Sequence, residues 1–129
     1  MMAMALIVGI WTTTCIQSQI SNVNHGYVKE TYTIEQSGSF EFKREWFYDP
    51  ECKDANTVDT ESGTLELGKK LQGLFITGDT YEANFSTQSG IDLGAIAVNR
   101  GHLKIARGVK NSTFRNTMVG LFEYFKVTP

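Results

Sequence analysis

Residues 27–48 read YVKETYTIEQSGSFEFKREWFY, and this stretch decides the class of fold. In its first part, the large side chains of Val28, Tyr32 and Ile34 alternate with lysine and threonine. A two-residue period of this kind is typical of a β-strand with one buried face. The residues QSG at 36–38 favour a turn, and the aromatic segment 39–48 alternates again. The stretch therefore predicts a β-hairpin.

The second strand of this hairpin carries an arginine among aromatic side chains. Alternation places five residues on one face: Phe40, Phe42, Arg44, Trp46 and Tyr48. An unpaired guanidinium in such surroundings is costly, so Arg44 needs a partner. Glu30, on the neighbouring strand, has the same facing and is the expected partner.

The same alternation continues on both sides of the hairpin. GIW at 9–11 opens a first strand, 63–78 holds two short strand candidates, and 80–88, 90–99, 102–107 and 117–128 each read as one strand. The acidic segment 49–61, DPECKDANTVDTE, lacks the ligand spacing of a calcium loop and is expected to be a solvated loop.

Short Gly and Ser turns between many strands indicate an antiparallel up-and-down sheet, and closing that sheet into a barrel removes its edges. The prediction is an all-β fold, an eight-stranded antiparallel up-and-down barrel, forming one domain over residues 1–129. A two-sheet sandwich is the alternative.

Composition excludes several classes of partner. The chain has a formal charge of -2, and its 12 Lys and Arg residues are scattered, so no basic stripe for nucleic acid is present.

The apolar segment 1–10, MMAMALIVGI, is shorter than the roughly 20 residues of a membrane helix. It is either the remnant of an export signal or the lead into the first strand.

Cysteine and histidine usage bears on metals and on location. Cys15 and Cys52 are the two cysteines, and His25 and His102 the two histidines, with no zinc-ligand spacing among them. No metal or cofactor is expected. The cysteines form either a disulfide or two buried thiols, and a disulfide would place the protein outside the cytoplasm.

Motifs for catalysis are also missing from the sequence. It contains no G-x-S-x-G, no H-E-x-x-H and no phosphate-binding glycine loop. The chain is therefore expected not to be an enzyme.

The residues GIW at 9–11 resemble the G-x-W signature of the lipocalin and wider calycin superfamily. The barrels of that superfamily have eight strands and hold one small, usually apolar ligand. Trp11 stands at the start of a strand, where a barrel closes, and is therefore expected to pack at the barrel floor. The resemblance matches Arg115, just before the last strand, to the basic residue that packs across that tryptophan in such barrels.

A narrower resemblance joins GIWTTTC at 9–15 with FYDPEC at 47–52. Together with the hairpin, this pattern is similar to the extracellular domain of the adenomatosis polyposis coli down-regulated protein family. The resemblance implies a lipocalin-like barrel, a bridge between Cys15 and Cys52, and secretion, which means an extracellular or periplasmic location.

These observations favour non-enzymatic binding of a small hydrophobic or amphipathic molecule in the barrel lumen, with Arg44 holding an acidic head group. The candidate ligand-binding residues are Glu30, Tyr32, Phe42, Arg44, Trp46, Tyr48, Tyr81 and Phe85. Two alternatives remain. Arg44 and Glu30 can form a structural pair inside a filled barrel, or the chain can be a ligand-free module that binds a protein partner, such as an inhibitor or an envelope-associated binding protein.

Overall fold

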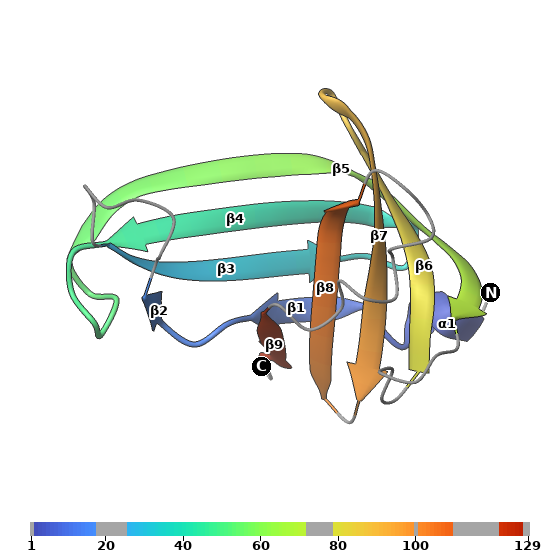
Figure 1. Ribbon diagram of the computed structural model, residues 1–129, viewed down its shortest axis with the longest axis horizontal. Helices are drawn as coiled ribbons and strands as arrows, with labels where there is room; N and C mark the ends of the chain where they lie inside the picture. Colours follow the sequence, from blue (N-terminus) through green and yellow to red (C-terminus); the bar gives the residue numbers. More distant parts are fainter. Residues whose placement is uncertain (1, 18–25, 72–78, 100, 110–121, 128–129) are drawn as a thin grey trace.

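The computed structural model describes residues 2–17, 26–71, 79–99, 101–109 and 122–127 (Figure 1). One short helix precedes the strands. In chain order the elements are α1 Met2–Ala5, β1 Gly9–Thr12, β2 Ile16–Gln17, β3 Tyr27–Ile34, β4 Ser39–Phe47, β5 Ala55–Leu71, β6 Asp79–Thr87, β7 Gly90–Asn99, β8 His102–Val109 and β9 Glu123–Lys126. In the described part of the chain, no helix has the length and apolar character needed to cross a membrane.

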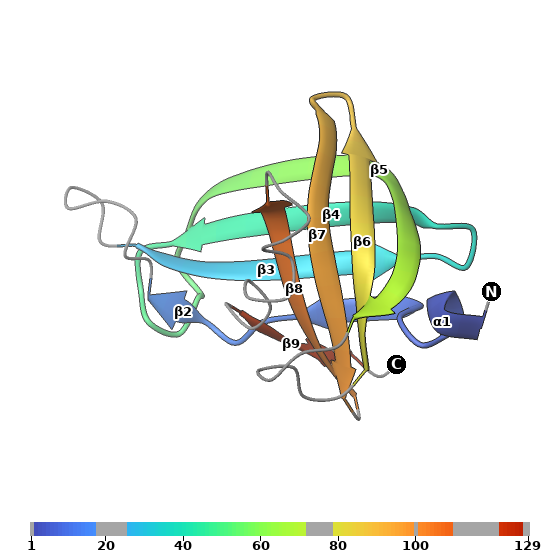
Figure 2. The ribbon, with the colours of Figure 1, turned by 45° about the vertical axis from the view of Figure 1, so that its right-hand side comes forward.

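The strands form an antiparallel sheet that closes on itself. Its order is β1-β9-β8-β7-β6-β5-β4-β3-β2, and β1 also pairs with β3. That last pairing closes a barrel of eight strands and leaves the two-residue β2 outside it, on the free part of β3. Both views show β6, β7 and β8 crossing β3, β4 and β5 steeply (Figures 1 and 2). The predicted eight-stranded up-and-down barrel is confirmed.

The hairpin of β3 and β4 has the predicted register. Glu30 lies opposite Arg44, and Tyr32 lies opposite Phe42. The turn closes where the Gly38 amide donates to the Glu35 carbonyl at 2.9 Å, with Gly38 at a φ of 97° that favours glycine. Antiparallel partners share one face of a sheet, so Glu30 and Arg44 both point into the barrel.

The predicted position of Tyr48 is wrong. The pairing with β5 shifts register between Glu45 and Phe47, which marks a bulge or similar irregularity. The extra residue lies on β5, because two steps along β4 correspond to three along β5, whereas β4 pairs with β3 without a shift as far as Phe47. Tyr48, which was expected to face the lumen, comes after the last residue of β4 and is 62% exposed, whereas Phe47 is 7% exposed.

The strand β5 also differs from the prediction. It is a single strand of 17 residues, and it begins at Ala55, inside the segment expected to be a loop. Its first part pairs with β4 and its second part with β6, beginning at Thr64. The first part is exposed almost throughout, so its sequence lacks the alternation that would have revealed it. At the changeover a Cβ on Gly63 would lie 1.9 Å from the Ser86 carbonyl oxygen, so only glycine fits there.

The closing strand is shorter than predicted within the described residues. β9 covers Glu123–Lys126, and residues 117–121 and 128 of the predicted segment lie outside the described part.

The hydrophobic core occupies one end of the barrel, next to α1. Trp11 is 2% exposed and donates its indole N–H to the Ile7 carbonyl at 2.9 Å. The cluster around it consists of Ile7, Tyr32, Ile34, Phe40, Leu65, Leu67, Ala83, Phe85, Ile96, Leu103, Ile105 and Tyr124. Trp11 therefore has the packing position that was expected of it.

Candidate functional site

The inward side chains change from apolar to charged along five strands of the barrel. The order is Ile34, Tyr32, Glu30 on β3; Phe40, Phe42, Arg44 on β4; Leu65, Gly63, Glu61 on β5; Ile96, Gly94, Asp92 on β7; and Leu103, Ile105, Arg107 on β8. The cross-strand register brings the charged members together at the end of the barrel away from α1.

A cavity of about 510 Å³ opens among these charged residues. We call it the lumen pocket. Its lining residues are Glu30, Tyr32, Phe42, Arg44, Glu61, Asp92, Ile105, Arg107, Phe122 and Tyr124. The pocket thus combines aromatic and aliphatic walls with five charged groups: three carboxylates and two guanidiniums.

The inner part of the pocket is an ion pair with a tyrosine. Arg44 donates through Nε and Nη2 to Glu30 Oε2, each at 2.7 Å. The Tyr124 hydroxyl donates to the other oxygen, Glu30 Oε1. The Glu30 side chain is 4% exposed and that of Arg44 is 37% exposed, so the carboxylate is the deeper partner. Burial raises the pKa of Tyr124 above its ordinary value and keeps this hydroxyl a donor.

The outer part of the pocket centres on Arg107. Its Nη2 donates to Glu61 Oε1 and to Asp92 Oδ2, both at 2.7 Å. Its Nη1 donates to the Tyr32 hydroxyl at 3.4 Å, and its guanidinium lies 4.7 Å from the centre of the Phe85 ring. Arg107 Nε is buried and has no hydrogen-bond partner among the described groups. Burial raises the pKa of Tyr32 to about 12, so this hydroxyl is neutral at neutral pH.

The structure brings together half of the predicted ligand-binding residues. Glu30, Tyr32, Phe42 and Arg44 all line the lumen pocket. Phe85 lies beneath it, fully buried under the Arg107 guanidinium.

The other three predicted residues are not among the pocket's lining residues. Tyr81 packs against the apolar core. Trp46 donates its indole N–H to Asp59 at 3.4 Å, and Tyr48 is exposed after the end of β4.

Sequence reasoning missed six lining residues: Glu61, Asp92, Ile105, Arg107, Phe122 and Tyr124. A signal for Arg107 was present, because Leu103, Ile105 and Arg107 repeat the two-residue spacing of Phe40, Phe42 and Arg44. Glu61 was assigned to a loop and gave no such signal.

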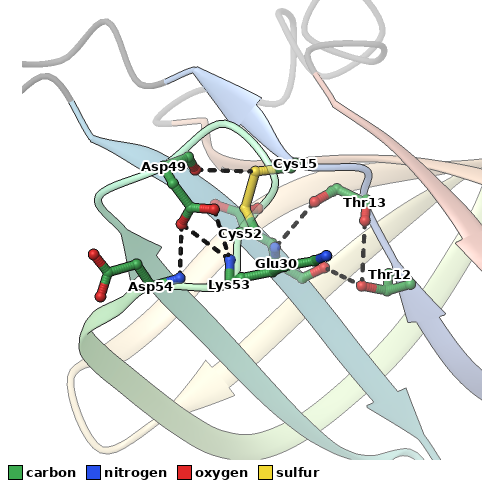
Figure 3. Close-up of a disulfide and its surroundings, with 8 residues drawn as sticks. All are labelled: Thr12, Thr13, Cys15, Glu30, Asp49, Cys52, Lys53 and Asp54. Atoms are coloured by element: carbon green, nitrogen blue, oxygen red, sulfur yellow. Dashed lines mark hydrogen bonds between the residues drawn. A yellow bond between two sulfur atoms is a disulfide. The ribbon is translucent and has the colours of Figure 1, made fainter.

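A disulfide joins Cys15 to Cys52 and supports the charged end of the barrel (Figure 3). Its two Cα atoms are 5.8 Å apart, and it closes a loop with a sequence separation of 37, which the chain-entropy model values at roughly 4 kcal/mol. Nearby, Thr13 donates its amide to the Glu30 carbonyl at 2.9 Å, and the Glu30 amide donates to Thr13 Oγ1 at 3.0 Å. The bridge therefore anchors the strand segment that carries Glu30.

The turn before β5 is held by one carboxylate. Asp49 accepts the amides of Lys53 and Asp54, at 3.0 Å and 2.7 Å (Figure 3). The Asp54 amide is the main cause that lowers the pKa of Asp49.

Two other expectations concern Arg115 and metals. Arg115 lies outside the described residues. Within the described ranges, no cluster of His, Cys, Asp or Glu has the arrangement of a metal site.

Comparison with known proteins yields a fold and no family. No family model matches the chain, and no curated protein is detectably similar to it. The structure is similar to the crystal structure of the lipoprotein YedD from Klebsiella pneumoniae subsp. pneumoniae, with a TM-score of 0.51 and 14% sequence identity. The match covers 95% of this chain and 73% of that chain. At this identity the similarity shows a shared barrel fold alone.

Proposed function

We propose that this chain binds one small hydrophobic or amphipathic molecule in the lumen pocket and performs no chemistry on it. The observation that carries the proposal is the cavity of about 510 Å³ inside the closed barrel. Small-molecule sites are typically concave, mostly apolar spaces of about 300–1,000 Å³ with a few polar groups. The pocket has that size and that mixture of side chains.

Different walls of the lumen pocket suit different parts of a ligand. Phe42, Ile105 and Phe122 offer apolar surface to the hydrophobic part of a ligand. The paired charges around Arg44 and Arg107 offer a polar end with fixed orientation. A ligand with one apolar and one polar part matches this division.

We further propose that the protein is exported to an extracellular or periplasmic location. The disulfide supports this, because disulfides persist in oxidising compartments. The similarity to a protein described as a lipoprotein is consistent with it. The barrel and the buried Trp11 of the GIW segment support a place among lipocalin-like proteins, and the narrower family resemblance stays a prediction.

The test is to fill the pocket. In Ile105→Trp the added ring volume enters the cavity, because Ile105 lines it. Ile91→Trp makes the same change at a side chain that is 67% exposed, outside the pocket. We expect native mass spectrometry with a panel of amphiphiles to show bound ligand on the wild type and on Ile91→Trp, and none on Ile105→Trp. Equal binding by all three would contradict the proposal.

A second candidate function rests on the free edge of β5. Within the described residues, Ala55–Gly63 pairs with β4 on one side, whereas pairing with β6 begins at Thr64. An exposed strand edge can accept an extended segment of another protein. If no panel member binds and a protein partner instead protects the amides of 55–63 from hydrogen exchange, the chain is an interaction module.

A further inference from the structure

We infer that the molecule held in the lumen pocket carries a positive charge, as an ammonium group attached to an apolar chain. The inference rests on the proposed function. Its basis is the placement of three carboxylates against two guanidiniums, beside aromatic rings, in one cavity.

The inner pair is balanced in charge. Both Arg44 donors reach one oxygen of Glu30, and Tyr124 donates to the other oxygen. Removing either partner from such a buried pair leaves the other charge uncompensated. An anionic head group that paired with Arg44 in place of Glu30 would leave the Glu30 carboxylate, the more deeply buried of the two, without a counter-charge.

The outer trio carries the uncompensated charge. Glu61 and Asp92 both contact the same nitrogen, Arg107 Nη2. Among the described residues, no cation other than Arg107 is in ion-pair contact with either carboxylate. One guanidinium cannot neutralise two carboxylates, so the trio carries a net negative charge.

The uncompensated negative charge of the trio lies on its more exposed side chains, the two carboxylates. The side chains of Glu61 and Asp92 are 34% and 44% exposed, against 16% for Arg107. Glu61 also lines a second crevice of about 480 Å³ that reaches the polar hairpin residues Thr87, Gln88 and Ser89. A positively charged group entering the pocket therefore meets these two carboxylates before it meets Arg107. The Arg44 side chain is 37% exposed, but its guanidinium is already paired with Glu30.

The remaining walls suit a cation as well. Tyr32, Phe42, Phe122 and Tyr124 line the pocket, and aromatic faces attract ammonium groups. Arg107 Nε, the buried donor without a partner, needs only a neutral oxygen such as a hydroxyl or a water. Nothing in this donor requires a negative ligand.

The experiment compares three probes with the same alkyl chain: dodecylammonium, dodecanoate and a neutral dodecyl glucoside. Each is titrated calorimetrically at neutral pH, below micelle formation and at concentrations that leave the circular dichroism unchanged. We expect the ammonium probe to bind about ten-fold more tightly than dodecanoate, which corresponds to about 1.4 kcal/mol. Dodecanoate binding as tightly as the ammonium probe would overturn the inference.

A matched pair of variants assigns the preference to the pocket. Glu61→Gln removes one lumen carboxylate while Asp92 still pairs with Arg107, and Glu66→Gln makes the same change at an exposed position of the same strand. We expect Glu61→Gln to weaken ammonium binding about five-fold and Glu66→Gln to leave it unchanged. Equal effects would also overturn the inference. If none of the three probes binds the wild type, it is the proposed lumen function that fails.

Discussion

The two ends of the barrel interior are built from the same strands and differ in almost every physical property. Near α1, residues such as Trp11, Phe85 and Leu103 are at most 2% exposed and form a continuous apolar cluster. Two to four residues further along the inward faces, Glu30 and Arg107 line a cavity. The difference shows that one barrel can separate stability from binding by changing side-chain chemistry along each strand.

The energetic roles of the two ends follow from this division. A fully buried large apolar side chain stabilises a fold by about 1.5–3 kcal/mol. A buried ion pair stabilises little, since desolvation offsets most of the attraction between the charges. We therefore assign most of the stability to the apolar end and the recognition to the charged end.

The largest expected effect is a difference in unfolding free energy between the alanine variants of two phenylalanines. Phe85→Ala removes a fully buried ring and should cost about 4 kcal/mol of unfolding free energy. Phe42→Ala removes a partly buried ring from the wall of an existing cavity, so its cost should be about 1–2 kcal/mol. Urea unfolding measures both. Equal costs would show that the two ends are packed alike.

A smaller effect is expected at the charged end. Arg44→Met leaves the buried Glu30 carboxylate with the Tyr124 hydroxyl as its described partner, and should cost about 2 kcal/mol. This value allows for the 37% exposure of the Arg44 side chain. The double variant Arg44→Met/Glu30→Leu should recover part of the loss, because no lone charge remains. A double variant less stable than the single one would contradict the pairing.

The smallest expected effect is a loss of unfolding free energy at alkaline pH. Burial raises the pKa of Tyr32 from 10.0 to about 12, so folding favours the protonated hydroxyl. Its contribution to stability is complete below about pH 10 and is lost as the pH rises through about 12. Tyr32→Phe should flatten the pH dependence of the unfolding free energy between these values. A variant with the full wild-type slope would show that another group controls alkaline unfolding.

The hairpin and the barrel were predictable because their signal is local. In a half-buried strand, inward and outward side chains alternate, so the two-residue period can be read from the sequence, as in β3 and β4. The pairing of Glu30 with Arg44 followed from that period and the short turn between the strands.

The rest of the site depended on contacts that the sequence does not record. Glu61 belongs to an exposed stretch of β5 whose residues have no hydrophobic alternation. Tyr124 reaches Glu30 across a separation of 94 residues, through the closure of the barrel. Tyr48 was misplaced because β4 ends at Phe47, one residue before the alternation of side chains was expected to stop.

The most direct test of the division between the two ends is a pair of tryptophan substitutions on β8. Leu103 and Ile105 face the same interior and both belong to the apolar cluster, but Leu103 is fully buried, whereas Ile105 also lines the lumen pocket. We expect Leu103→Trp to lower the unfolding free energy by about 3 kcal/mol through overpacking, and Ile105→Trp to lower it by less than about 1 kcal/mol, because the cavity accepts the ring. Equal losses in urea unfolding would mean that the interior is filled at both ends, and would contradict the account.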